Sequence, residues 1–329
     1  MSAAHIAGEA GRAEGVSPPG QRSAGTGGPG GSSPAGSGRG GAPEAGPRRA
    51  GQPGGPGGSS PRASRVSVAF EKAAAGGRAA LVGYLPAGFP SVAGAAEAAV
   101  AIAQAGADVI EIGLPYSDPL MDGPVIQEAT YRALAGGTHV TDVLRTVETV
   151  AAAGVPTLVM TYWNPVDHYG VAAFARDLAA AGGAGLITPD LPPEEAGDWL
   201  EASDACGLDR VFLVAPSSSG ARIERITADC RGFVYAASLM GTTGARDSVG
   251  AAAAGLVTRV REATSLPVAV GLGVRDGVQA AEVAGFADGV IVGSAFVQRL
   301  LAAPDAQAGL DSVRDLAAEL AAGVRTPVR

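Results

Sequence analysis

The stretch SVAGAAEAAVAIAQAGADVIEI, residues 91–112, joins the two patterns that indicate the fold. Its first part, 91–104, is rich in alanine with apolar residues at helical spacing, which predicts an amphipathic helix. Its last part, 108–112, is a short, almost continuous apolar run, typical of a strand covered on both faces. A helix that leads into such a strand is the repeating unit of α/β proteins with parallel sheets.

The same alternation continues along the chain and predicts a closed (β/α)8 TIM barrel, because eight strands in 265 residues suit a barrel better than an open sheet. An open doubly wound sheet is the alternative, but its glycine fingerprint is missing from 84–90. We expect one helix at 67–75 to close the bottom of the barrel and another at 306–322 to end it. The other predicted strands are 79–85, 157–162, 185–188, 210–214, 233–237, 268–270 and 289–292, and the other predicted helices are 140–152, 171–181, 194–206, 221–229 and 251–263.

Residues 1–64 differ in composition from the rest of the chain. They hold 19 of the 50 glycines and 9 of the 23 prolines, with no leucine and no aromatic residue. Such a segment buries too little apolar surface to offset the entropy lost on ordering. We therefore predict a disordered, inert tail at 1–64 and a single TIM-barrel catalytic domain at 65–329.

Charge and cysteine content exclude several classes of protein. The formal net charge is -8, with 18 basic against 29 acidic residues after the tail, which argues against nucleic-acid binding. No apolar run approaches the ~18 residues of a membrane span, and the N-terminus lacks the apolar core of a secretory signal. Cys206 and Cys230 match no compact metal or redox motif, so we expect two free thiols and a cytoplasmic protein.

Glu111 is a carboxylate inside the apolar run 108–112. Strand alternation places it on the face opposite Ile110 and Ile112, and therefore toward the barrel interior. Desolvation at that position raises a carboxyl pKa toward the working range of a general acid or base. The alternative is a structural glutamate paired with a buried cation.

The loop after this strand, 113–124, carries Asp118 and Asp122 among three prolines. Active sites of these barrels lie at the carboxyl ends of the strands, where this loop begins. The eleven-residue spacing allows the Glu111 and Asp122 carboxylates to face one another across a small ligand. An ordinary solvated turn is the alternative, since Asp-Gly and Asp-Pro are common turn pairs.

Glycines gather at the ends of the last three predicted strands. Glycine lets backbone N–H groups approach an anion closely, and the loops after strands seven and eight often hold phosphate in this fold. Steric relief at crowded strand ends is the alternative. The residues are Gly241, Gly244, Gly271, Gly273 and Gly293, the last followed by Ser294.

At these positions the sequence resembles the tryptophan synthase alpha chain family. The similarity covers about residues 65–322 and excludes the tail. The motifs that carry it, in chain order, are EIGLPYSDPLMDGP (111–124), MTYWNP (160–165), LITPDLPPEE (186–195), SLMGTTGAR (238–246) and VGSAFV (292–297).

The resemblance implies a carbon–carbon lyase of tryptophan biosynthesis that splits indole-3-glycerol phosphate into indole and glyceraldehyde 3-phosphate by a retro-aldol reaction. Glu111 matches the general acid/base of the family, and Asp122 matches the carboxylate that binds the indole N–H. Tyr235 matches a tyrosine near the glycerol, and Thr243 matches a loop residue that bonds the aspartate.

Further matches concern substrate binding. Tyr84, Met160 and Leu272 match positions that line the indole pocket, and Leu272 departs from the phenylalanine of many relatives. Leu239 departs from an arginine that many relatives have beside the loop. The positions that match phosphate contacts are Gly244, Gly273, Gly293 and Ser294.

The resemblance also implies that the chain itself needs no cofactor and no metal. It implies a partner, the pyridoxal-phosphate-dependent tryptophan synthase beta chain, in an α2β2 heterotetramer. Asp118 and the loops at 114–124 and 239–250 are expected near that interface. Alternatives are a stand-alone lyase that releases free indole, a catalytically silent activating subunit, and another phosphate-binding barrel such as a sugar-phosphate isomerase.

Because no motif lies in the tail, removing residues 1–64 is expected to leave the lyase activity intact. The measurement is the rate of indole formation by the full-length and shortened chains under the same conditions. A large loss of activity in the shortened chain would show that the tail takes part in function.

Overall fold

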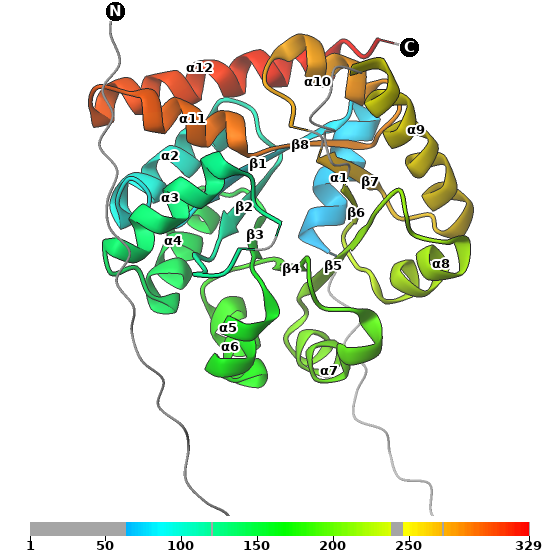
Figure 1. Ribbon diagram of the computed structural model, residues 1–329, viewed down its shortest axis with the longest axis horizontal. Helices are drawn as coiled ribbons and strands as arrows, with labels where there is room; N and C mark the ends of the chain where they lie inside the picture. The colour runs from blue at the N-terminus through cyan, green and yellow to red at the C-terminus, as the bar shows by residue number, and fades with distance from the viewer. Residues whose placement is uncertain (1–63, 120, 238–245, 272, 329) are drawn as a thin grey trace, which may run out of the picture. The chain divides into compact units, whose positions relative to one another are not determined.

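Eight short parallel strands pair in chain order and close on themselves in the computed structural model (Figure 1). The structure describes residues 64–119, 121–237, 246–271 and 273–328, and of residues 246–249 only the backbone. The strands are β1 (Ala80–Pro86), β2 (Val109–Gly113), β3 (Thr157–Met160), β4 (Gly185–Thr188), β5 (Asp209–Val214), β6 (Val234–Ala237), β7 (Val268–Gly271) and β8 (Gly289–Val292). The predicted TIM barrel is thus confirmed, and each strand lies within two residues of its predicted bounds.

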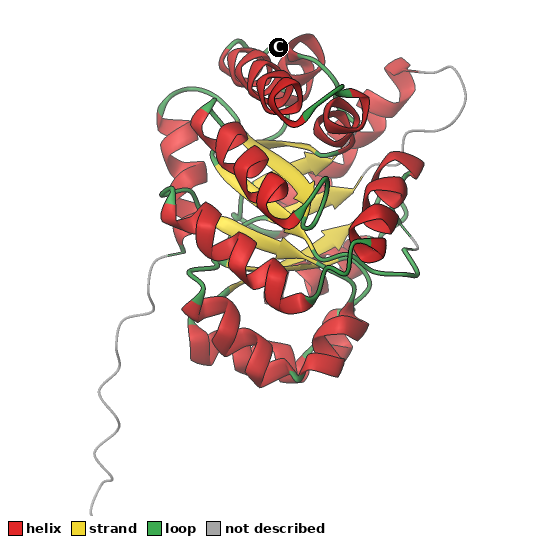
Figure 2. Cartoon of the chain, turned by 90° about the vertical axis from the view of Figure 1, so that its left-hand side faces the viewer, coloured by secondary structure: helices red, strands yellow, loops and turns green. Residues whose placement is uncertain are grey.

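Helices surround the strands on the outside (Figure 2). The described helices are α1 (Arg65–Ala75), α2 (Val92–Gln104), α3 (Pro124–Ala135), α4 (Val140–Ala152), α5 (Trp163–Tyr169), α6 (Val171–Ala180), η1 (Pro193–Glu195), α7 (Gly197–Cys206), α8 (Gly220–Asp229), α9 (Arg246–Ala263), α10 (Gly277–Ala284), α11 (Ser294–Ala302) and α12 (Ala306–Arg325). No described helix is both long enough and apolar enough to cross a membrane.

Some helices differ from the prediction. The predicted helix 194–206 is wrong in its first turn, because Ala196 separates the 3-10 turn η1 from α7. Helices α3, α5 and α10 were not predicted. Each follows the loop at the carboxyl end of a strand. Polar residues or prolines in these stretches obscure the helical spacing of apolar residues.

The side chains of each strand alternate between two cores. Outward residues pack against the helices, and inward residues fill the barrel in a second cluster that includes Val82, Val109, Leu158 and Ile291, all nearly unexposed. Met160, Leu213 and Tyr235 adjoin this inner cluster but are only partly buried. They therefore form the boundary where the packed interior gives way to the open, carboxyl end of the barrel.

Helix α1 closes the opposite end, as predicted. Val66 and Phe70 pack into the inner cluster, and the Phe70 ring stacks on Phe233 with centroids 5.2 Å apart. The Ser64 side chain accepts the Ser67 N–H as the N-cap and donates to Asp209 Oδ2 at 2.6 Å. The helix therefore begins with a bond to the first residue of β5.

Ser64 was assigned to the tail by composition, yet it is part of the barrel structure. The chain divides into two units, Met1–Pro56 and Gly57–Arg329, and the residues described here belong to the second. Because Ser64 bonds to β5, a shortened chain should retain this residue.

Ser64→Ala is expected to destabilise the chain by about 1 to 2 kcal/mol, because it removes an N-cap and a hydrogen bond to a carboxylate. Urea unfolding measured against the parent gives the value. Ser217→Ala, at an exposed serine in the β5–α8 loop, is the matched control and should change stability by less than about 0.5 kcal/mol. Equal stability of both variants would contradict the capping role.

Candidate active site

Glu111 lies in the middle of β2, paired in register with Tyr84 of β1 and Leu158 of β3. Its side chain has no solvent exposure. Among the described residues, neither of its carboxylate oxygens has a hydrogen-bond partner. Burial therefore raises the pKa of Glu111 from 4.5 to about 8, which keeps this carboxyl group largely protonated at neutral pH.

A structural ion pair at Glu111 is not found in the described part of the chain. The arginines that begin or precede strands are occupied elsewhere: Arg78 pairs with Asp108 at 2.6 Å and Arg210 with Asp204 at 2.5 Å. Both pairs are outside the barrel interior, at the amino ends of β2 and β5. The absence of a cation beside Glu111 is what leaves the desolvation uncompensated.

Two tyrosines lie near Glu111, one on the neighbouring strand β1 and one on β6 across the barrel. Tyr84 of β1 is 8% exposed, and Tyr235 of β6 adjoins the inner cluster. Burial, and then the charges of Glu111 and Asp122, raise the pKa of both phenols well above the ordinary value. Each phenol therefore lies within electrostatic range of both carboxyl groups.

Asp122 lies in the β2–α3 loop and is partly buried. Burial raises the pKa of its carboxyl group above the ordinary value, although the group remains closer to solvent than Glu111. The loop main chain is bonded on both sides: the Met121 N–H donates to Tyr162 Oη at 2.8 Å, and Gln127 Nε2 donates to the Asp122 carbonyl at 2.8 Å. These two bonds fix the main chain on both sides of the Asp122 side chain.

Glycines on the neighbouring strands make room for the two tyrosine rings. A Cβ on Gly113 would collide with the Tyr84 hydroxyl, and one on Gly293 would lie 3.0 Å from Tyr84 Cδ1. A Cβ on Gly271 would lie 2.5 Å from Tyr235 Oη. Steric relief, the alternative considered from the sequence, therefore accounts for Gly271 and for part of the role of Gly293.

The start of α11 is suited to an anion. Gly293 is its N-cap, and no side chain caps the first turn of the helix, so its leading N–H groups have no intrahelical acceptor. Ser294 is the first helical residue, and Gly273 has a φ of 68°, a left-handed conformation that favours glycine. These three predicted phosphate residues thus lie at the carboxyl ends of β7 and β8.

The floor of the site combines a predicted residue with one that sequence reasoning missed. Met160 ends β3, as expected, and Leu213 of β5 adjoins the same inner cluster without being fully buried. Leu213 follows Val211 at a spacing of two on the strand, and this inward alternation was the signal that could have found it. Thr243, Gly244, Leu239 and Leu272 lie outside the described residues.

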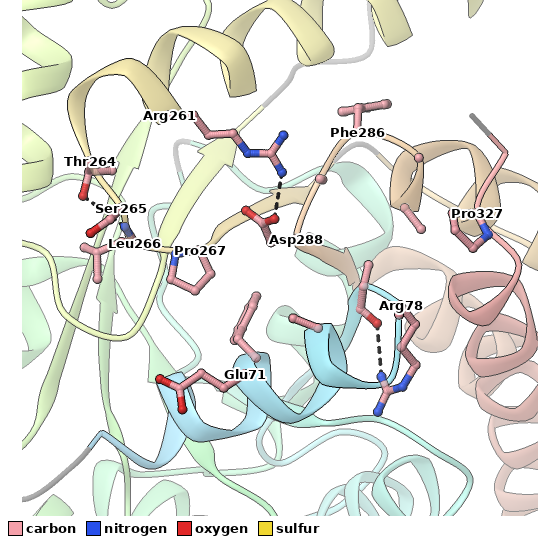
Figure 3. Close-up of a pocket in the computed structure, with 17 residues that line it drawn as sticks. Glu71, Arg78, Arg261, Thr264, Ser265, Leu266, Pro267, Phe286, Asp288 and Pro327 are labelled. Carbon is pink, nitrogen blue, oxygen red and sulfur yellow. Dashed lines mark hydrogen bonds and ion pairs between the residues drawn. The ribbon is translucent and has the colours of Figure 1, made fainter.

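A cavity of about 650 Å³ lies at the other end of the barrel (Figure 3). It is lined by the end of α1 and by the loops before β1, β7 and β8, where Arg261 faces Asp288 at 2.7 Å. None of the predicted site residues lines this cavity. In TIM barrels chemistry is located at the carboxyl ends of the strands, so this cavity is not the candidate active site.

Comparisons with known proteins identify the family of this chain. The family model described as Tryptophan synthase alpha chain matches residues 70–325. The chain belongs to this family. A tryptophan synthase alpha chain of Salinispora arenicola is 65% identical over 264 residues, which cover 80% of this chain and 99% of that protein. One of Thermobifida fusca is 62% identical over 261 residues, covering 78% and 97%.

Solved structures of the tryptophan synthase alpha chain family give the same fold. A chain in a Mycobacterium tuberculosis tryptophan synthase structure superposes with a TM-score of 0.74 at 55% identity, covering 80% of this chain and 99% of that one. The alpha subunit of Legionella pneumophila superposes with a TM-score of 0.73 at 32% identity, covering 80% and 99%. The fold is thus shared even at 32% sequence identity.

The raised pKa of Glu111 makes stability depend on pH. Between 4.5 and about 8 the folded chain holds a proton on Glu111 that the unfolded chain releases, so this residue lowers stability as pH rises through that interval. Glu111→Gln cannot ionise. We therefore expect the free energy of unfolding of Glu111→Gln, relative to that of the parent, to increase by up to about 3 kcal/mol from pH 5 to pH 8.

Urea unfolding at several pH values measures this difference. Glu201→Gln, at an exposed position on α7, is the matched control and should follow the parent curve. A constant difference between Glu111→Gln and the parent at all pH values would mean that Glu111 is ionised in the folded chain at neutral pH.

Proposed function

We propose that this chain, as a tryptophan synthase alpha chain, cleaves indole-3-glycerol phosphate to indole and glyceraldehyde 3-phosphate. The observation that carries the proposal is the fully buried Glu111 on the inner face of β2, which together with Asp122 acts electrostatically on Tyr84 and Tyr235. A retro-aldol cleavage needs a proton donor at carbon, a group that stabilises positive charge on the indole, and a base for a hydroxyl. These residues supply all three.

In the first step the Glu111 carboxylic acid protonates C3 of the indole ring. Positive charge then develops at the ring nitrogen, and the Asp122 carboxylate accepts the indole N–H and stabilises that charge. In the second step the Glu111 carboxylate removes the proton from the hydroxyl on the carbon attached to C3. The C3–carbon bond breaks, its electrons return to the indole, and the aldehyde forms with no net change in protons.

The different surroundings of the two carboxyl groups support these roles. Glu111 lies in a dry interior and holds its proton to about pH 8, whereas Asp122 stands at the partly exposed rim. Environments that separate two pKa values allow one group to be the acid while the other is the anion. In this proposal Tyr235, whose hydroxyl lies close to Gly271, bonds the glycerol oxygen beside Glu111.

The ends of the substrate have separate sites in this proposal. The phosphate is held by Gly273, Gly293 and Ser294 at the start of α11, and by Gly244. The indole lies among Tyr84, Met160 and Leu272, with Leu213 below it. Thr243 bonds Asp122 when the loop that carries it approaches the substrate.

The chain uses proton transfer alone in this scheme and requires no cofactor or metal of its own. We propose the tryptophan synthase beta chain as its partner in an α2β2 complex, with pyridoxal phosphate bound to the beta chain. Neighbouring structures are of tryptophan synthase, which supports this assembly. Asp118 and Met121, both exposed in the β2–α3 loop, are available to a partner. The free thiols of Cys206 and Cys230 support a reducing, cytoplasmic location.

Glu111→Gln is expected to lower turnover by ~10²-fold or more, because it keeps the shape of the side chain and removes the transferable proton. Asp122→Asn should act similarly. Indole formation from indole-3-glycerol phosphate measures turnover, and calorimetric titration with glycerol 3-phosphate checks that the phosphate site is intact. Glu201→Gln serves as the control. Near-parental turnover of Glu111→Gln would refute the assignment.

The same assay separates the subunit from a stand-alone lyase. If the isolated chain makes indole as fast as it does with the beta chain, it works alone. If neither preparation makes indole, the chain is a silent activating subunit. The intact acid and phosphate residues favour a rate that rises when the beta chain is added.

A further inference from the structure

The β2–α3 loop that carries Asp122 is buried at its start and more exposed further along. Leu114 is 9% exposed, whereas Met121 is 48% exposed and Ser117 and Asp118 are also exposed. The Met121 side chain therefore adds little buried surface beside Asp122, and hydrogen bonds to the main chain help to fix the loop there.

Tyr162 makes one such contact from a buried position. It is 6% exposed, and its Oη accepts the Met121 N–H at 2.8 Å. The Tyr162 ring lies against Tyr116 with centroids 5.4 Å apart, so one side chain contacts both the beginning and the end of the loop.

The position of Tyr162 is itself fixed from a third loop. Tyr162 is the N-cap residue of α5, but its side chain does not cap the helix. The Trp163 N–H donates instead to both carboxylate oxygens of Asp190, at 2.9 and 3.1 Å, in the loop after β4. Because Asp190 supplies the cap, the phenol of Tyr162 is available to the β2–α3 loop.

We propose that Tyr162 is a positioning residue, whose hydroxyl holds the Met121–Asp122 main chain so that the Asp122 carboxylate stands over Glu111. The inference rests on the proposed role of Asp122. A 1 Å displacement of a group that stabilises the transition state costs rate more than it costs substrate binding. In this proposal the hydroxyl acts on turnover through Asp122.

Tyr162→Phe removes the acceptor and keeps the ring contact with Tyr116. We expect kcat for indole formation to fall about tenfold, the size of one well-placed hydrogen bond, while KM for indole-3-glycerol phosphate changes less than about threefold. Tyr169→Phe is the matched control, since this tyrosine of the same helix donates to Asp177 away from the loop. It should leave both constants within twofold of the parent.

A double-mutant cycle separates positioning from a general structural effect. In the Asp122→Asn background, Tyr162→Phe should lower kcat less than twofold, because the group that it positions has already lost its charge. Enzyme concentrations high enough to follow the slow variants make this measurable. Thermal unfolding of the single variants should show that Tyr162→Phe remains as folded as Tyr169→Phe.

The outcomes are distinct. Parental kcat in Tyr162→Phe, or the same tenfold loss with and without the Asp122 carboxylate, would overturn the positioning role. If Asp122→Asn itself has parental turnover, the proposed function of Asp122 fails first. Loss of activity in Asp122→Asn together with a strongly non-additive cycle supports both.

Discussion

The rest of the site depends on one carboxyl group that is buried inside the barrel with no cation beside it among the described residues. Glu111 has no exposed surface and, in the described part of the chain, no hydrogen-bond partner, so burial favours its neutral form. The closed ring of strands makes this possible, because helices cover its outside and α1 closes its other end. Burial of this carboxyl group lowers the stability of the fold, but it also keeps the group protonated near neutral pH, as a general acid requires.

The remaining features of the site arrange other groups around that carboxyl. The β2–α3 loop adds Asp122, β1 and β6 add the two phenols, and the start of α11 offers N–H groups at a distance from them. Each comes from a different strand end, and the barrel register fixes their separation. The candidate site thus lies at the carboxyl end of the barrel, and α1 closes the amino end.

Much of this was accessible from the sequence. Alternation of strand and helix predicted the barrel. The alternation of side chains along β2 predicted that Glu111 points inward. Other features depend on contacts between distant segments. Nothing in the local pattern near Tyr162 indicates that its hydroxyl meets the Met121 amide, and the run 157–162 suggested a strand where α5 begins. Ser64 was assigned to the tail because amino-acid composition gives no information on its hydrogen bond to Asp209.

The glycines beside Tyr84 have a consequence for the range of substrates. Because Gly113 and Gly293 leave their Cβ space to this ring, the main chain of β2 and the β8–α11 junction form the wall behind it. A larger side chain at either glycine would displace the ring toward the barrel interior. In the proposed site this ring borders the indole, so a smaller residue at position 84 would make room for a bulkier aryl group.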